Sequence, residues 1–231
     1  MSVWKAKGKS IRLLAAGLLM MTAAGVSAHS QQTTRRRETS ATRRARTQRI
    51  IADTYTRRWE VAGGGGYMRW RSGQSLQKNN EVTFWVDTAY FFNQKLGVVG
   101  GVHGAYGNAK IGNTYFNQPD NPQISEYTFM AGPEFRVYRE QKSAVSLFVT
   151  GGSALGKFGG GSKGIPETEL GIWPSSNAKP AFSIGANLDY NLFPNFAFRV
   201  TPAYVGTNFG DTLQNNFNLN VGLVYRFGRI H

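Results

Sequence analysis

The chain has 231 residues, no cysteine, three histidines and a formal net charge of +14. Without cysteine the fold cannot rely on disulfide bonds, and no cluster of cysteine and histidine suggests a zinc site. The charge is uneven, because residues 29–58 carry nine arginines and only two acidic side chains, whereas residues 59–231 have a net charge of +3. The basic composition therefore describes a short arm and excludes a strongly basic folded surface.

Residues 1–28 have the pattern of a secretory signal peptide. Residues 5–12 contain four basic side chains and no acidic one, residues 13–24 are apolar, and residues 26–28 form a small-residue cleavage site. The alternative, a membrane-anchoring helix, needs roughly 20 apolar residues and is disfavoured by the shorter stretch. The sequence therefore predicts an exported protein.

Residues 29–57 form a second segment, rich in arginine, glutamine, threonine and serine. This composition predicts a disordered arm, within which residues 47–54 weakly favour one or two helical turns. An arginine-rich arm can bind nucleic acid, acidic lipid or cell-wall carboxylates. Because the arm lacks a folded nucleic-acid-binding motif and is exported, we expect a cell-wall or other anionic partner and no nucleic acid.

The remaining residues, 58–231, alternate between apolar and polar side chains, which predicts strands with two different faces. In the last segment Leu219, Leu223 and Tyr225 share one face, whereas Asn218 and Asn220 lie on the other. A helix would mix these two sets within one turn. Eight such segments follow one another, at 58–71, 81–92, 96–107, 124–138, 144–156, 180–192, 196–207 and 215–228.

The predicted connections alternate between tight turns and longer loops. Turns centred on residues 94, 141 and 194 are tight, and the other connections, at 72–80, 108–123, 157–179 and 208–214, are longer. A register centred on each tight turn keeps apolar residues opposite apolar residues, and a slip by one residue would reverse the faces. The predicted pairs are Phe92–Leu96, Tyr90–Val98, Val86–Val102, Val137–Val145, Phe135–Leu147, Leu192–Phe196, Tyr190–Phe198 and Asp189–Arg199.

These features predict an all-β fold, an eight-stranded antiparallel up-and-down transmembrane β-barrel. A soluble lipocalin-like barrel, with its apolar face inside, is the alternative. The polar face contains too many glycines, amides and charges, and too few long solubilising side chains, to be a soluble exterior. Aromatic residues also gather near the strand ends of the apolar face, with aliphatic residues between them. This arrangement is typical of a barrel whose apolar face contacts lipid.

The closing strand carries the motif Asn220-x-Gly222-x-x-Tyr225-x-Phe227. This motif resembles the C-terminal assembly signal of outer-membrane barrels, although residues 228–231 follow the aromatic residue that usually ends the chain. The 58–228 region is similar to the small eight-stranded family that includes the outer-membrane protein A barrel and its adhesin-like relatives. The resemblance implies a bacterial outer-membrane location, with the arm and the C-terminus in the periplasm. It also implies contact with outer-membrane lipid, lipopolysaccharide and the barrel-assembly machinery.

Charged residues on the polar face would share a lumen that side chains can fill. First-to-last strand pairing brings Glu60 towards Arg226, and the turn register pairs Asp189 with Arg199. We interpret the set as a charge network that plugs the lumen; the alternative is a gate in a narrow ion path. The predicted lumen charge network consists of Glu60, Asp87, Glu134, Arg136, Asp189, Arg199 and Arg226.

The sequence thus favours a non-enzymatic barrel with a structural or surface-interaction role. Its candidate contact surface is the set of long loops, with Tyr115 and Phe116 in one and Trp173 in another. The alternative is a narrow ion or small-solute channel gated by the interior salt bridges. No catalytic triad is recognisable, because His103 faces the lumen opposite Trp85 without a nearby serine, so neither a catalytic residue, a metal nor a cofactor is expected.

Overall fold

The computed structural model describes residues 39–111 and 121–230. The predicted signal peptide, the first part of the predicted arm, and the loop residues Tyr115 and Phe116 lie outside the described residues. One helix precedes eight strands, which are α2 (Ser40–Tyr55), β1 (Trp59–Arg71), β2 (Lys78–Phe91), β3 (Leu96–Asn108), β4 (Gln123–Arg139), β5 (Ser143–Gly160), β6 (Ser176–Phe193), β7 (Phe196–Phe209) and β8 (Thr212–Phe227). Among the described residues, no helix has the length and apolar character needed to cross a membrane.

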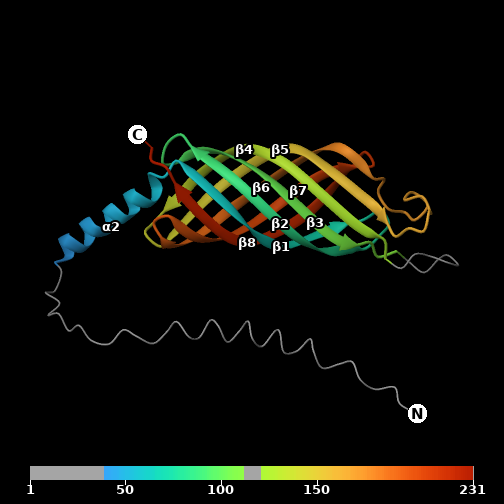
Figure 1. Cartoon of the computed structure of the whole chain (residues 1–231), viewed down its shortest axis with the longest axis horizontal. Helices are drawn as coiled ribbons and strands as arrows, with labels where there is room; N and C mark the ends of the chain where they lie inside the picture. Colours follow the sequence, from blue (N-terminus) through green and yellow to red (C-terminus); the bar gives the residue numbers. More distant parts are fainter. Residues whose placement is uncertain (1–38, 112–120, 231) are drawn as a thin grey trace, which may run out of the picture. The chain divides into compact units, whose positions relative to one another are not determined.

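The eight strands form a closed barrel in which each strand pairs antiparallel with its neighbours in the sequence (Figure 1). Closure comes from β1 and β8, which pair from Trp59↔Phe227 to Arg69↔Phe217. The predicted eight-stranded up-and-down barrel is therefore confirmed. We call the end with the tight turns between β2 and β3, β4 and β5, and β6 and β7 the short-turn end, and the opposite end the loop end.

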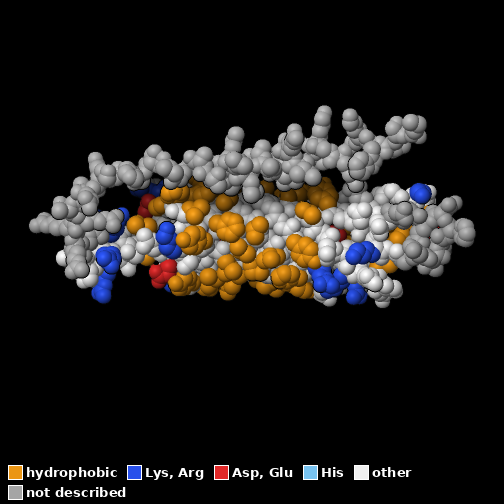
Figure 2. Space-filling view, turned by 90° about the horizontal axis from the view of Figure 1, so that it is seen from below, with side chains coloured by type: hydrophobic (Ala, Val, Ile, Leu, Met, Phe, Trp, Pro, Cys, Tyr) orange, Lys and Arg blue, Asp and Glu red, His pale blue; other side chains and the backbone are white. Residues whose placement is uncertain are grey.

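The outer face of the barrel is apolar, and its charged strand residues are turned into the interior. Leu188 and Leu223 are 42% and 48% exposed, whereas Asp189 and Arg226 are only 6% and 0% exposed. Figure 2 shows the outer apolar side chains as a broad band along the barrel, with lysine and arginine gathered towards its ends. The alternative of a soluble barrel with an apolar interior is excluded, because water would face this whole apolar band.

Aromatic residues contact one another near both ends of the outer face. At the short-turn end the Trp59 ring lies 4.8 Å from that of Tyr90 and 6.4 Å from that of Phe227. At the loop end the Tyr106 and Tyr127 rings are 5.7 Å apart. Aromatic girdles of this kind flank the apolar band of transmembrane barrels, where rings with one polar edge suit the membrane interface.

The predicted hairpin registers are confirmed within the strands and fail beside two turns. Val145 pairs with Tyr138 instead of Val137, and Phe196 pairs with Phe193 instead of Leu192. Each failure lies at a register shift, where one strand holds an extra residue and the count from the turn changes by one. The confirmed pairs are Tyr90↔Val98, Val86↔Val102, Phe135↔Leu147, Tyr190↔Phe198 and Asp189↔Arg199.

The strands extend further towards the loop end than predicted, and one predicted loop is a tight turn. β5 and β6 each gain four residues there, which shortens the 157–179 loop. Between β7 and β8, Phe209 pairs with Thr212, so only Gly210 and Asp211 form the turn. Both have positive φ values, 58° and 57°, the backbone conformation of a tight hairpin turn. The strict alternation of short and long connections is therefore wrong at this position.

The described part of the arm is helical, which corrects the prediction of disorder for residues 40–55. α2 spans 16 residues and contains neither glycine nor proline, while alanine, arginine and glutamine favour a helix. The composition that suggested disorder is thus compatible with a helix once its C-terminal end is held. That end is anchored because Thr54 and Tyr55 are buried.

Candidate functional site

Alternation along the strands turns a set of charged side chains into the lumen near the short-turn end. Glu60 on β1 is the centre of this set and is 1% exposed. Its carboxylate accepts hydrogen bonds from Arg226 Nε at 2.6 Å, from Arg199 Nη2 at 2.9 Å and from Arg136. The three arginines come from β8, β7 and β4, so this one carboxylate links four strands across the lumen.

Asp189 on β6 is the second acidic centre of the network. Arg199 donates to both of its oxygens, from Nε at 2.6 Å and from Nη2 at 2.8 Å. Arg226 Nη2 donates to Asp189 Oδ2 at 2.6 Å and Arg226 Nη1 to Asn191 Oδ1 at 2.7 Å. Bidentate contacts between arginine and carboxylate restrict the relative orientation of the two groups. The network therefore holds β1, β6, β7 and β8 in one arrangement.

Two predicted network members stand apart from this centre. Glu134 is buried and accepts a hydrogen bond from Asn187 Nδ2 at 3.0 Å, and among the described residues no ion pair joins it to an arginine. Asp87 lies against His103, whose Nε2 is 2.9 Å from Asp87 Oδ1. The structure therefore brings Glu60, Arg136, Asp189, Arg199 and Arg226 into direct contact, while Glu134 and Asp87 bond to other lumen residues.

Tyr55, at the end of α2, contacts the same network from the short-turn end. Its hydroxyl donates to the Glu140 carbonyl oxygen at 2.8 Å and accepts from Asn191 Nδ2 at 2.9 Å. The Arg136 and Arg226 guanidinium carbons lie 5.7 and 5.9 Å from the centre of its ring. Burial raises the pKa of the Tyr55 hydroxyl, so this group stays neutral at physiological pH.

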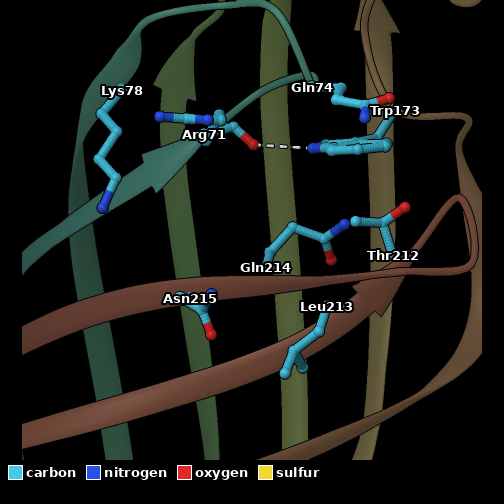
Figure 3. Close-up of a pocket in the computed structure, with 8 residues that line it drawn as sticks. All are labelled: Arg71, Gln74, Lys78, Trp173, Thr212, Leu213, Gln214 and Asn215. Atoms are coloured by element: carbon cyan, nitrogen blue, oxygen red, sulfur yellow. Dashed lines mark hydrogen bonds between the residues drawn. The ribbon is translucent and has the colours of Figure 1, made fainter.

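A cavity of about 220 Å³ opens at the loop end. Its lining includes two basic side chains, Arg71 and Lys78, and no acidic residue. Figure 3 shows the indole nitrogen of Trp173 donating to the Arg71 carbonyl oxygen, at 2.9 Å. The other lining residues are Gln74, Thr212, Leu213, Gln214 and Asn215. This site offers positive charge and amide groups to a ligand outside the barrel.

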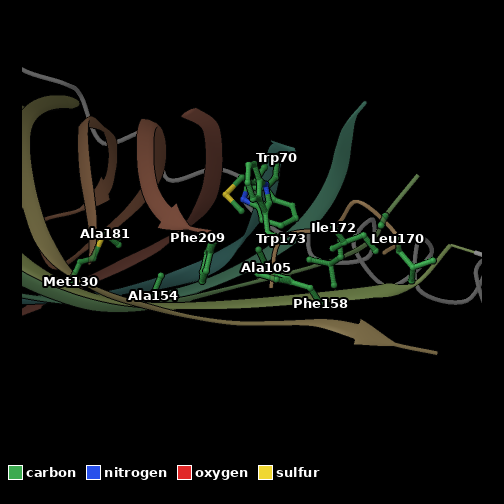
Figure 4. Close-up of a cluster of buried hydrophobic side chains, with 13 residues drawn as sticks. Trp70, Ala105, Met130, Ala154, Phe158, Leu170, Ile172, Trp173, Ala181 and Phe209 are labelled. Atoms are coloured by element: carbon green, nitrogen blue, oxygen red, sulfur yellow. The ribbon is translucent and has the colours of Figure 1, made fainter. Parts of the chain in front are cut away.

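Beneath this cavity, an apolar cluster fills the loop end of the lumen (Figure 4). The Phe158 ring lies 5.0 Å from that of Trp70 and 4.9 Å from that of Phe209. Leu170, Ile172 and Trp173 of the β5–β6 loop pack on the same cluster. The sequence predicted Trp173 as a loop contact residue. Its side chain is mostly buried, because it packs on this cluster.

The four residues of the closing motif have two different environments. Asn220 is buried in the lumen, where its Oδ1 accepts a hydrogen bond from Thr83 at 2.8 Å. Gly222 pairs with Gly64 across the closing seam, and a Cβ atom on it would lie 2.7 Å from the Trp85 ring. Tyr225 and Phe227 are exposed on the outer face with rings 6.0 Å apart. The motif thus combines lumen packing at the seam with aromatic contact on the outside.

The described residues contain no group of three or more histidine, cysteine, aspartate or glutamate side chains placed to hold a metal ion. The network in direct contact has two acidic and three basic members, Glu60 and Asp189 with Arg136, Arg199 and Arg226. Paired and hydrogen-bonded charges of this kind can remain ionised in a lumen and resist its opening.

The closed barrel, its apolar outer band and its ion-paired interior define the class of the small eight-stranded outer-membrane β-barrels. Solved structures of that class are similar to the chain in fold. Neisserial surface protein A has a TM-score of 0.52 at 13% identity, covering 73% of this chain and 97% of that protein. Ail, the attachment invasion locus protein of Yersinia pestis, has a TM-score of 0.47 at 22% identity, covering 74% and 99%. OprG from Pseudomonas aeruginosa has a TM-score of 0.44 at 14% identity, covering 75% and 98%. No protein-family model and no curated protein matches the chain.

Sequence reasoning missed several lumen residues for different reasons. Tyr55 lay in a segment predicted as disordered, and no local signal indicated that it contacts the charge network. Glu81 and Glu126 have the same parity as Asp87 and Glu134 on their strands, so alternation alone places them in the lumen. The contact of His103 with Asp87 follows from the β2–β3 register, which sets the two residues diagonally on one face.

Proposed function

We propose that this chain is a non-enzymatic outer-membrane barrel whose lumen is plugged and whose role is structural or surface-interacting. The observation that carries the proposal is that both ends of the lumen are filled. Ion pairs around Glu60 occupy the short-turn end, and the cluster around Phe158 occupies the loop end. A barrel filled in this way presents only its outer surface, its ends and its loops to partners.

An even number of strands places the arm and the C-terminus at the same end of the barrel. Thr56 and Ile230 are linked there by a backbone hydrogen bond of 2.7 Å. We assign this end to the periplasm, because short turns face the periplasm in outer-membrane barrels. In this orientation α2 carries Arg43, Arg44 and Arg49 into the periplasm, where cell-wall carboxylates or another anionic partner would bind them. The basic cavity then faces the cell exterior.

The cavity lined by Arg71, Lys78 and Trp173 is the proposed surface-interaction site. Two basic side chains with neighbouring amides suit an anionic, hydrogen-bonding ligand such as the phosphorylated saccharide of lipopolysaccharide. Charge-assisted hydrogen bonds contribute about 1.5–3 kcal/mol each, so removing both basic groups is expected to weaken binding at least tenfold.

Lipopolysaccharide binding to the refolded protein tests this site. The double variant Arg71→Gln/Lys78→Gln should lose most of the binding, while the exposed control Lys157→Gln should retain it. Equal binding by wild type and the double variant would remove the cavity from the proposal. A wild-type protein that binds neither lipopolysaccharide nor cells, matrix or other envelope components would count against an interaction role altogether.

A channel is the second candidate, favoured by small cavities between the two filled ends. His103 lines two of them, of about 10 and 20 Å³. In this alternative, the pairs made by Arg199 would break to open an ion path. Planar-bilayer recordings of wild type and Arg199→Ala separate the candidates, because silence in both eliminates the channel. An enzymatic role is tested by mass spectrometry of lipid A from cells with and without the protein, which should be unchanged.

A further inference from the structure

Two acidic side chains in the loop half of the lumen have no counter-charge. Glu81 on β2 and Glu126 on β4 are 0% and 1% exposed, and none of their four carboxylate oxygens has a hydrogen-bond partner among the described residues. Only β3 separates their strands, and it places small residues opposite them, because Ala105 pairs with Glu126 and Gly107 faces Glu81. The two side chains therefore flank β3 in the loop half of the lumen, two strands apart.

Unsatisfied oxygen atoms from β8 lie in this half of the lumen as well. The Oδ1 atoms of Asn216 and Asn218 are buried and have no hydrogen-bond partner in the described part of the chain. Asn218 and Glu126 line the same cavity of about 10 Å³, which has room for about one water-sized particle. Among the described residues, His103 is the only basic side chain that lines this cavity; its Nε2 faces Asp87, and its Nδ1 is buried without a hydrogen-bond partner. The cavity lining thus offers carboxylate, amide and hydroxyl oxygens, and the Thr83 hydroxyl already donates to Asn220.

Burying ionised carboxylates without partners is costly, and the apolar cluster makes this region dry. Ile124 lies two residues before Glu126 on the same face of β4, and Met68 pairs with Glu81 across β1 and β2. Both belong to the cluster around Phe158. In such a low-dielectric region an unpaired charge is strongly unfavourable, and a bound cation would remove that penalty.

We propose that Glu81, Glu126 and Asn218 form a binding site for one hard divalent cation of the calcium class inside the lumen. Hard cations take carboxylate and amide oxygens as ligands, which are the groups left unsatisfied here. Magnesium demands a near-ideal octahedral shell and loses its waters reluctantly, whereas calcium takes roughly 6–8 oxygen ligands in a flexible geometry and accepts two oxygens from one carboxylate. The two carboxylates balance the charge of the ion.

Calcium retention by the refolded full-length protein tests the site directly. Wild type and variants are refolded with calcium chloride or with a chelator, passed through a desalting column, and analysed for bound calcium by atomic emission. Wild type should retain one calcium per chain, and Glu126→Gln and Glu81→Gln should retain none. Glu169→Gln, on the exposed part of the β5–β6 loop, is the matched control and should behave as wild type.

Urea unfolding supplies a readout that does not depend on the variants folding well. The midpoint for wild type should rise with calcium over that with chelator, and potassium should not reproduce the rise. Absence of both retained calcium and a midpoint shift in wild type overturns the proposal and indicates that the two carboxyls are protonated. Equal calcium retention by wild type and Glu126→Gln would also overturn it, because the ion would then be bound elsewhere.

Discussion

The two halves of the lumen are filled by different chemistry. At the short-turn end, Glu60 and Asp189 hold three arginines in a network of buried ion pairs. At the loop end, the rings of Trp70, Phe158 and Phe209 pack together, with two unpaired acids beneath them. Either ion pairs or apolar side chains can fill the lumen of a narrow barrel. The two kinds of filling should differ in how much stability is lost when one side chain is removed.

Removal of the central acid should have the largest effect. Glu60→Gln leaves three buried guanidinium groups facing one carboxylate fewer, and breaking a buried ion pair costs about 3–5 kcal/mol. We expect the free energy of unfolding in lipid vesicles, measured by urea titration, to fall by that amount. Glu140→Gln, whose side chain is exposed at the short-turn end, is the control and should change little. A Glu60→Gln protein as stable as wild type would show that the network does not hold the barrel.

A smaller loss is expected in the apolar half. Ile172 is buried in the cluster, and Ile172→Ala removes three carbon atoms from it. Because the residue lies on a loop that can partly collapse into the space, we expect a loss of about 2–3 kcal/mol in the same titration. Thr168→Ala, at an exposed position of the same loop, is the control. An unchanged stability would mean that the loop does not pack on the lumen.

Removal of the Tyr55 hydroxyl should cost about 1 kcal/mol, the net contribution of a typical hydrogen bond. Its pKa is raised by burial in the folded protein, so the folded state holds the proton more tightly than the unfolded state. The stability linked to this proton is complete below the ordinary tyrosine pKa near 10 and is lost as the pH rises above it. Tyr55→Phe should therefore lose less stability than wild type between neutral pH and strongly alkaline pH. Parallel pH curves for the two proteins would contradict this.

The smallest effect is expected where an ion pair is exposed. Lys179 Nζ lies 3.3 Å from Asp211 Oδ1, and the Asp211 side chain is 90% exposed. Asp211→Asn should change the free energy of unfolding by less than about 0.5 kcal/mol, since water screens such pairs. Asparagine also tolerates the positive φ of this turn residue, so the backbone is not strained. A loss comparable to that of Glu60→Gln would remove the distinction between exposed and buried pairs.

Alternation of side chains predicted most of the fold because strand pairing preserves parity along the whole barrel. The pairing of Asp189 with Arg199 and of Glu60 with Arg226 follows from that parity and from closure. The bulges beside two turns were not predicted, because only a few residues lie between each bulge and its turn, too short a stretch to show the shifted alternation. The loop-end strands were predicted too short, since glycine and lysine at 156–160 resemble loop composition although they continue β5.

The candidate site was only partly predictable for a different reason. Parity identifies which residues face the lumen, and it does not identify which of them meet. Glu60 contacts three arginines on three strands, whereas Asp87 of the same predicted set contacts His103. Tyr55 reaches the network from outside the barrel strands, so strand alternation contains no information about it.

The seam between β1 and β8 joins residues from opposite ends of the folded chain, such as Trp59 and Phe227. During synthesis β1 is therefore complete long before its partner exists, and one of its edges has open backbone donors and acceptors. Such an edge can pair with any other extended chain, which promotes aggregation in an unprotected intermediate. Until β8 pairs with β1, the chain can avoid aggregation only if the open edge of β1 is covered by another molecule.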